Sequence, residues 1–237
     1  MPLVHVSTHP LVAHHVIALR DPATRPAEFR RVVAQLARLL AVEATAALPT
    51  VDVRVPTPLS EAAGRRIAER IAIVPILRAG LGMAEGLLEL IPDAEVWHIG
   101  LSRDEATLRP QEYYNKLPAN FGASTAIVVD PMLATGGSAV RTCEILRKAG
   151  IPRIIFLALI ASPEGVARLE AAMPDVSIHI AALDEGLNDA GFIVPGLGDA
   201  GDRQFGTSTD LSIHGANPDA GCRPHPQKTG WQRTDGR

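Results

Sequence analysis

Residues 127–138, IVVDPMLATGGS, are the part of this 237-residue chain that most strongly indicates its fold class. An apolar run ends in Asp130, and a turn with Thr135, two glycines and Ser138 leads into a helical pattern. Backbone N–H groups at a helix N-terminus bind phosphate, and glycines let the backbone approach the anion. An acid at the carboxyl end of a parallel strand can accept hydrogen bonds from ribose hydroxyls. The stretch therefore predicts an α/β fold with a phosphate-binding turn.

Other folds also place glycines before a helix. A dinucleotide-binding fold would need Gly-x-Gly-x-x-Gly after a predicted strand, and a P-loop would need Gly-Lys-Ser/Thr. No Gly-x-Gly-x-x-Gly directly follows a predicted strand, and no Gly-Lys-Ser/Thr is present in the sequence. An ordinary capped helix after a strand remains the alternative interpretation of the turn.

Strand-like and helix-like segments alternate around this turn. We expect strands at 51–55, 71–77, 96–101, 125–129, 154–160 and 176–183, and helices at 26–48, 81–90, 137–149 and 163–172. This alternation predicts a mainly parallel twisted sheet flanked by helices. Thr24 is the expected N-cap of the first helix, after a polar N-terminal arm. Residues 108–118, with paired tyrosines, are expected to form a projecting hairpin or flap, and the Gly- and Asp-rich residues 184–206 a long functional loop.

Composition limits the classes of function. The hydrophobic fraction of 46% allows a sizeable core, and the net charge of −3 argues against nucleic acid or an anionic membrane as a partner. Cys143 and Cys222 form neither a metal spacing nor a disulfide framework, and no secretory signal is visible. We therefore expect a cytoplasmic protein with one domain over residues 1–207 and a flexible tail over 208–237.

A second anion site is expected at VPILRAGLG, residues 74–82. A buried strand delivers Arg78, and small residues and a helix follow it. Arg103 comes directly after the next predicted strand, so both guanidinium groups would lie at the same edge of the sheet. Arginine binds phosphate groups in a bidentate manner, so this pair is suited to a diphosphate. Surface ion pairs are the alternative role for these two arginines.

Three strings resemble the uracil phosphoribosyltransferases, a type I phosphoribosyltransferase family: residues 74–82, DPMLATGGS at 130–138 and PGLGDAGDRQFGT at 195–207. The similarity runs from about residue 9 to residue 207. It implies the type I fold with a projecting flap and a hood loop that binds the base. It also implies transfer of the phosphoribosyl group of 5-phospho-α-D-ribose 1-diphosphate (PRPP) to N1 of uracil. The products would be UMP and diphosphate, as in pyrimidine salvage.

The resemblance also implies roles for individual residues. The catalytic set would be Arg78, Arg103, Asp130 and Asp199. PRPP would contact Arg78, Arg103, Asp130, Pro131, Met132, Leu133, Ala134, Thr135, Gly136, Gly137, Ser138 and Asp199. Uracil would contact Ile193, Gly198, Asp199 and Ala200. Mg²⁺ would enter with the diphosphate of PRPP, with Asp199 as the candidate protein ligand. Many phosphoribosyltransferases carry a second acid directly after the first. This chain has Pro131 at that position, and the uracil-specific enzymes have a proline there as well.

The resemblance implies a homo-oligomer, a dimer or larger, and makes GTP a candidate allosteric effector. A nucleotide-sensing RNA-binding regulator on the same fold is the alternative function, although it would need a basic face. Purine or orotate transfer is the alternative within enzymes, and the Gly-rich base loop, residues 192–202, argues against it. A metal site at His9, His14 and His15 lacks a fourth ligand, and Cys143 reads as a core residue rather than a nucleophile.

Overall fold

The computed structural model describes residues 4–103, 110–118 and 122–207, and at residues 102, 103, 110 and 111 it describes the backbone alone. Its main sheet has nine strands, ordered β1-β11-β10-β8-β4-β6-β7, with β5 beside β4 and β9 beside β10. The pairings are parallel except between β6 and β7. The strands are β1 (Val4–Val6), β4 (Ile71–Leu77), β5 (Glu95–Val96), β6 (Ile99–Arg103), β7 (Pro110–Asn115), β8 (Thr125–Val129), β9 (Met132–Leu133), β10 (Arg153–Ala161) and β11 (Ser177–Leu183). The predicted fold class is confirmed.

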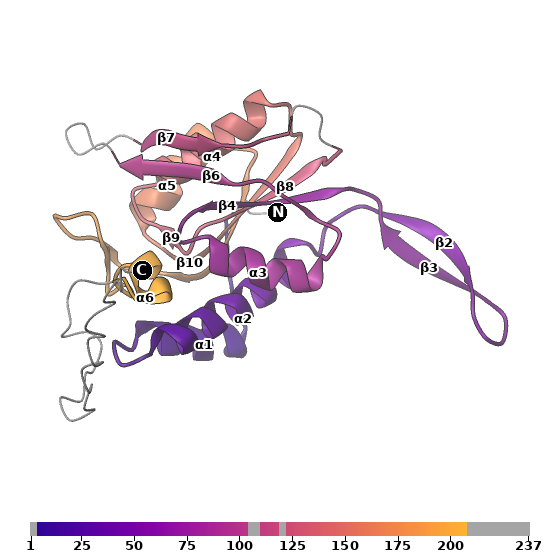
Figure 1. The fold of residues 1–237 in the computed structure, drawn as a ribbon, viewed down its shortest axis with the longest axis horizontal. Helices are drawn as coiled ribbons and strands as arrows, with labels where there is room; N and C mark the ends of the chain where they lie inside the picture. The colour runs from indigo at the N-terminus through magenta and orange to yellow at the C-terminus, as the bar shows by residue number, and fades with distance from the viewer. Residues whose placement is uncertain (1–3, 104–109, 119–121, 208–237) are drawn as a thin grey trace, which may run out of the picture.

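Helices cover both faces of this sheet (Figure 1). One face carries α1 (Pro10–Arg20), α2 (Pro26–Ala44) and α3 (Leu81–Leu90), and the other carries α4 (Gly137–Lys148) and α5 (Pro163–Ala172). Successive side chains of a strand point to opposite faces, so strands buried on both sides read as continuous apolar runs. The first face contributes Ile73, Ile127 and Leu157, and the second Val74, Val128 and Phe156.

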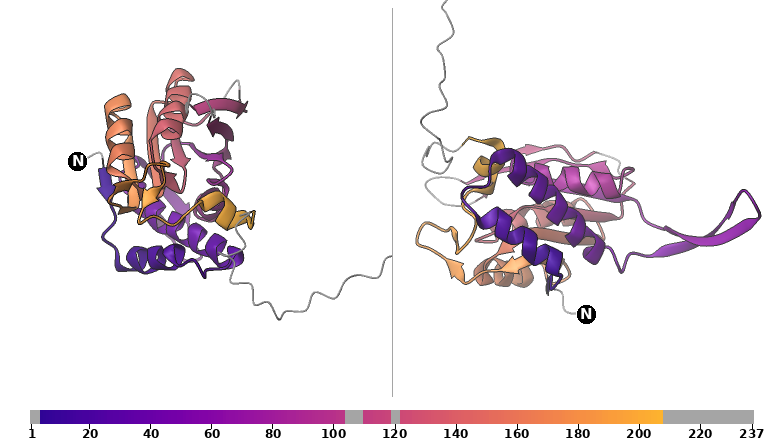
Figure 2. Two further views of the ribbon diagram at one scale, coloured as in Figure 1. Left: turned by 90° about the vertical axis from the view of Figure 1, so that its left-hand side faces the viewer. Right: turned by 90° about the horizontal axis from the view of Figure 1, so that it is seen from below.

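The expected N-terminal arm is wrong, because it forms β1 and α1. Val12, Val16 and Leu19 recur at helical spacing and are buried against α2, which lies beside α1 (Figure 2). The expected cap is also wrong: Arg25 occupies the N-cap of α2, and the Thr24 hydroxyl donates to Ala18 O instead. The helix expected at 26–48 ends at Ala44.

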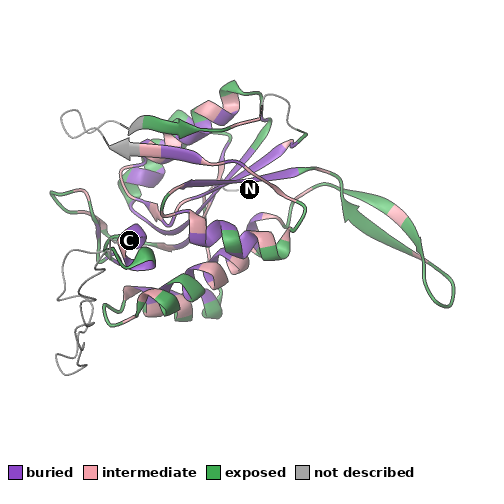
Figure 3. Cartoon of the chain, in the orientation of Figure 1, coloured by how far each residue is buried: buried purple, intermediate pink, exposed green. Residues whose placement is uncertain are grey.

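A long two-stranded arm extends away from the body (Figure 1). It consists of β2 (Thr50–Pro56) and β3 (Glu61–Ile67), which pair antiparallel. Almost all of its residues are exposed (Figure 3), which explains why β3 lacks a hydrophobic pattern that predicts a strand. The predicted hairpin at 108–118 corresponds to β7, which pairs antiparallel with β6. Residues 104–109 between these two strands lie outside the described residues.

The expected long loop at 184–206 contains more regular structure than its composition predicts. A small antiparallel ladder joins β12 (Gly186–Leu187) to β13 (Ile193–Val194), and α6 (Ala200–Phe205) follows. The Asp199 side chain caps α6 by accepting from Asp202 N at 2.8 Å, and Gly206 ends the helix at φ 65°. The predicted tail at 208–237, with Cys222, lies outside the described residues. No helix in the described part is long and apolar enough to cross a membrane.

Candidate active site

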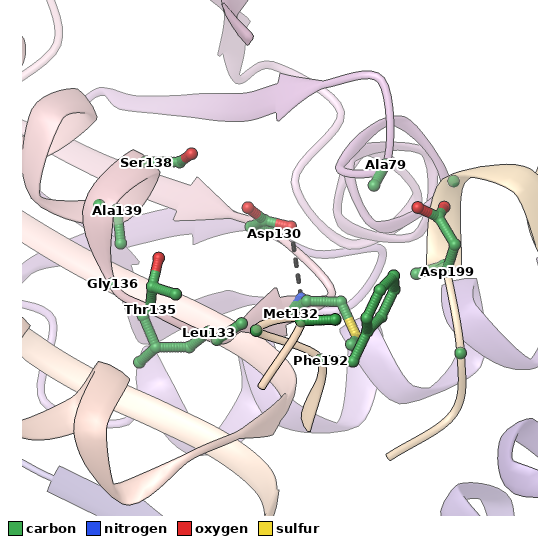
Figure 4. Close-up of a pocket in the computed structure, with 17 residues that line it drawn as sticks. Ala79, Asp130, Met132, Leu133, Thr135, Gly136, Ser138, Ala139, Phe192 and Asp199 are labelled. Carbon is green, nitrogen blue, oxygen red and sulfur yellow. Dashed lines mark hydrogen bonds between the residues drawn. The ribbon is translucent and has the colours of Figure 1, made fainter. Parts of the chain in front are cut away.

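A cavity of about 330 Å³ opens where β8 meets the N-terminus of α4 (Figure 4). Its lining includes Ala79 beside β4, Asp130, residues 132–139 and, from the C-terminal segment, residues 190–192 and 198–201. The structure thus brings together the predicted phosphate turn with Gly198, Asp199 and Ala200. Pro131 is absent from this lining and is buried, and its carbonyl accepts from Leu159 N and Ile160 N at 3.1 Å. Pro131 therefore ties the turn to β10.

The phosphate turn rests on the start of α5. Ser162, fully buried, donates its backbone N–H to Leu133 O at 3.0 Å and its hydroxyl to Ala134 O at 2.7 Å. Arg168 Nη1 donates to Thr135 O at 3.2 Å. Three successive carbonyls of the turn are therefore held by α5. The first N–H groups of α4, from Gly137 onward, have no partner within the helix and are available to an anion in the cavity.

Two carboxyl groups reach this cavity from different elements. Asp130 follows β8, and Asp199 precedes α6 (Figure 4). Burial raises the pKa of Asp130 to about 7, the N–H of Met132 opposes that shift, and the charge of Asp199 adds to it. Without a bound ligand, the Asp130 carboxyl therefore exchanges its proton near neutral pH.

This raised pKa predicts a pH dependence of stability. Folded protein retains a proton on Asp130 that the unfolded chain releases between about pH 4 and pH 7, so stability should fall as pH rises through this window. The contribution is roughly 2–4 kcal/mol, at about 1.4 kcal/mol per pKa unit. Urea unfolding of Asp130→Asn and wild type between pH 4.5 and 8 should show a flatter profile for the variant. Asp93→Asn, at an exposed turn, is the control; parallel profiles for Asp130→Asn and wild type would contradict the prediction.

The predicted second anion site lies next to this cavity. Arg78 follows β4 and is mostly exposed; its Nη2 lies 3.4 Å from Asp202 Oδ1, and its guanidinium lies 5.8 Å from the Phe205 ring centre. The Leu77–Arg78 peptide bond is cis. Arg103 is the last residue of β6. In the sheet β4 lies between β6 and β8, the strand that Asp130 follows. Arg78 therefore does form the surface ion pair that was the alternative role, with Asp202. An exposed pair of this kind contributes little to stability.

A second cavity, of about 320 Å³, lies on the other side of the base loop. It is lined by Arg20, Pro22, Thr24, Pro26, residues 195–199, Asp202 and Arg203. Gly198 and Asp199 line both cavities. Ile193 lines neither, and its side chain is buried in the core. Its predicted contact with a base therefore cannot come from an exposed side chain in this structure.

Two ionic groups that the sequence analysis missed hold the base loop. Arg20 donates to both oxygens of Asp184, at 2.8 and 2.5 Å, and also to Gly196 O at 2.8 Å. Asp184 in turn accepts from Gly196 N at 2.8 Å. Burial opposes the ionisation of Asp184, but these bonds outweigh it and hold its pKa below the usual value. The one available signal was the position of Asp184 at the end of β11, because its partner is 164 residues away.

Arg203 is a third group that the sequence analysis missed. Its side chain is buried and donates to the carbonyls of Leu19, Asp21 and Leu197. Its guanidinium also lies 4.5 Å from the ring centre of Phe29. Arg203 therefore ties the base loop to the end of α1 and to α2.

The structure also shows the surroundings of three histidines and of Cys143. His9 caps α1 by accepting from Leu11 N at 3.1 Å, and the rings of His14 and His15 are 5.4 Å apart. Within the described ranges no three His, Cys, Asp or Glu side chains are grouped to hold a metal. Cys143 is fully buried in α4, and burial raises the pKa of its thiol to about 12, so its assignment as a core residue is confirmed.

Comparisons with known proteins agree with this geometry. The family model described as uracil phosphoribosyltransferase matches residues 6–207. The uracil phosphoribosyltransferase of Roseiflexus castenholzii is 56% identical over 207 residues, which is 87% of this chain and 100% of the relative. That of Geobacillus kaustophilus is 55% identical over 205 residues, covering 86% and 98%. The AQ2163 protein of Aquifex aeolicus is similar in structure, with a TM-score of 0.82, 36% identity and 87% and 99% coverage.

Proposed function

The chain belongs to the uracil phosphoribosyltransferase family, and from this premise we infer how its residues carry out the reaction. It is a glycosyltransferase that moves the phosphoribosyl group of PRPP to N1 of uracil. The alternative of an RNA-binding sensor has no support among the comparisons. The observation that carries our assignment of the site is that Gly198 and Asp199 line both cavities. These two residues belong to the base loop, so a sugar phosphate bound at the turn would lie against that loop.

We assign the 5′-phosphate to the turn at Thr135–Ser138. The N–H groups at the start of α4 and the two hydroxyls supply donors, and α5 holds the carbonyls of the turn away from the anion. Residues 132–134 shape the wall beside the ribose, and Pro131 fixes that wall to β10. The Asp130 carboxylate accepts hydrogen bonds from the ribose hydroxyls. Because its pKa is about 7, the group can lose its proton at neutral pH when the ribose binds.

The diphosphate is assigned to the turn at residues 78–80 between β4 and α3, the Arg78 loop, with Arg103 from the neighbouring strand end. Arg78 is exposed and weakly paired, so it can leave Asp202 for a more highly charged partner. Mg²⁺ fits the chemistry of this corner, because Asp130 and Asp199 offer the oxygen donors it prefers. Two protein carboxylates do not complete its coordination, so the diphosphate oxygens and water would supply the other ligands. The metal would neutralise charge on the leaving diphosphate.

The reaction then requires little covalent chemistry from the protein. The C1′–O bond to diphosphate breaks, the N1–C1′ bond forms on the opposite face, and the proton of N1 passes to water or to the released diphosphate. Charge develops on the departing oxygens, where Arg78 and Arg103 stabilise it. Holding uracil and C1′ within reach of each other supplies much of the remaining acceleration. Tyr113 and Tyr114 of β7, both exposed, are assigned the exclusion of water when the site is occupied.

The base is assigned to the backbone around Ile193 and Gly198–Ala200. Uracil presents two carbonyl acceptors on either side of an N–H donor, whereas cytosine presents an amino donor and a ring acceptor. A backbone fixed by Arg20, Asp184 and Arg203 cannot turn its N–H and C=O groups to suit both. A mismatched base leaves buried polar groups unpaired, at about 1–3 kcal/mol each.

A panel of bases tests this function. Purified protein, PRPP and Mg²⁺ would be incubated with uracil, cytosine, orotate, hypoxanthine or adenine, and nucleoside monophosphate measured. We expect UMP with uracil, at a rate at least 100-fold above that of any other product. Rapid product with another base would overturn the assignment of the base loop. No product with any base, with intact folding, would overturn the function.

Further properties complete the proposal. We propose a homo-oligomer, GTP as a candidate effector, and location in the cytoplasm. We also propose that residues 1–207 form one domain and that the tail at 208–237 lies outside it. Size-exclusion chromatography with light scattering tests the assembly, and initial rates with and without GTP test the effector. Removal of residues 208–237 should leave UMP formation unchanged.

A further inference from the structure

The buried side chain of Gln204 joins the two halves of the active site. It is fully buried in α6, and its Nε2 donates to Ala79 O at 2.9 Å and to Ala200 O at 3.0 Å. Ala79 belongs to the Arg78 loop, and Ala200 belongs to the base loop. Both residues line the 330 Å³ cavity. One amide group therefore joins two walls of the cavity, the Arg78 loop on the diphosphate side and the base loop on the base side.

The other end of this amide is unusual. Gln204 Oε1 is buried without a hydrogen-bond partner among the described residues, and it packs against Gly82, where an added Cβ would collide with it. An unpaired buried acceptor destabilises the fold, and an apolar side chain of similar length would avoid that penalty. The two N–H bonds are thus the contribution that distinguishes glutamine from an apolar residue here.

Both walls joined by Gln204 are otherwise held by separate supports. An added Cβ at Gly80 would lie 2.8 and 2.9 Å from the backbone N and O of Ile76, so the Arg78 loop packs tightly against its own strand. The base loop is held by Arg20, Asp184 and Arg203 on the far side. Other contacts between the walls, those of Arg78 with Asp202 and with the Phe205 ring, involve an exposed guanidinium and are weakened by solvent. Gln204 therefore provides a buried, hydrogen-bonded connection between them.

We propose that Gln204 is a positioning residue that couples the base loop to the Arg78 loop, so that the base and the diphosphate each increase the affinity for the other. This rests on the proposed function of the two loops. When diphosphate orders the Arg78 loop, Ala79 O becomes fixed, and through Gln204 the start of α6 becomes fixed as well. Uracil then binds to a loop that has already lost its freedom. Linkage makes the effect reciprocal.

Uracil and diphosphate with Mg²⁺ test the coupling, because this pair cannot react. Calorimetry on the full chain would give the Kd of uracil with and without saturating diphosphate. We expect the ratio of the two Kd values to be at least 10 for wild type, within the usual range of 5–150. Gln204→Met keeps the length of the side chain but removes both donors, and its ratio should fall below about 3.

Arg30→Met is the matched control. Arg30 donates to the backbone carbonyl of Gln204 at 2.6 Å, so this variant also loses a side-chain bond to α6 but keeps the amide bridge. A merely structural role would make the two variants behave alike. A ratio above 10 in the control and below 3 in Gln204→Met supports coupling. An unchanged ratio in Gln204→Met, or a ratio near 1 in wild type, overturns it.

Hydrogen exchange of the wild-type protein provides a test that does not depend on a variant. If the walls are coupled, binding of diphosphate alone should slow amide exchange at residues 200–205. If the walls are independent, diphosphate should leave exchange at these residues nearly unchanged. If wild type binds neither uracil nor diphosphate, the proposed function fails. If it binds both without coupling, the inference about Gln204 alone fails.

Discussion

Replacement of Gly165 by alanine is expected to lower kcat/KM for PRPP by about 100-fold, although Gly165 does not line the cavity. An added Cβ would collide with the backbone oxygens of Leu133 and Ala134, and neither main-chain atom can rotate away. The phosphate turn would have to move outward from α5. A displacement of about 1 Å at a reacting group costs on the order of 100-fold in rate.

Initial rates at varied PRPP measure this effect, with uracil saturating. Gly150→Ala is the control, because Gly150 also tolerates an added side chain poorly, at φ 97°, but has open space around it and is not part of the site. We expect that control to lose about 1 kcal/mol of stability and to keep its rate. A Gly165→Ala enzyme with the wild-type KM for PRPP would show that the turn does not hold the phosphate.

Asp184→Ala is expected to reduce the free energy of unfolding by about 3 kcal/mol. The substitution leaves the half-buried guanidinium of Arg20 without its partner, and removing one member of a buried pair typically costs about 3–5 kcal/mol. Arg20 is partly exposed, so the lower end applies. The Gly196 N–H also loses its acceptor. Uracil affinity should fall with it, because Gly196 lies in the base loop.

Urea unfolding at pH 7 measures the loss. The pH profile gives the sign independently: the pKa of Asp184 lies below its usual value, so its contribution is present above about pH 4 and is lost as pH falls through the lower pKa of the folded state. The double variant Arg20→Met with Asp184→Leu should recover part of the stability, because it leaves no unpaired charge. A double variant less stable than Asp184→Ala would contradict this account.

Local patterns predicted most of the central sheet correctly. The runs at β4, β8 and β10 are apolar on both faces, and a helix period follows each. The expected helix at residues 163–172 matches α5, and the one at 81–90 matches α3. The predictions missed β3 and α6, because neither has a hydrophobic pattern of its own. β3 is exposed, and α6 is only six residues long, with Gly and Asp near its start.

The sequence alone indicated the turn at residues 130–138, the Arg78 loop and most of the central strands and helices, because each depends on chemistry within about a dozen residues. Tertiary structure decided what supports the site. Arg20 meets Asp184 across 164 residues, Arg203 meets Leu19 across 184, and Gln204 meets Ala79 across 125. An arginine or glutamine side chain can donate to any carbonyl or carboxylate group in the protein. Only the folded path of the chain decides which of these acceptors lies next to it.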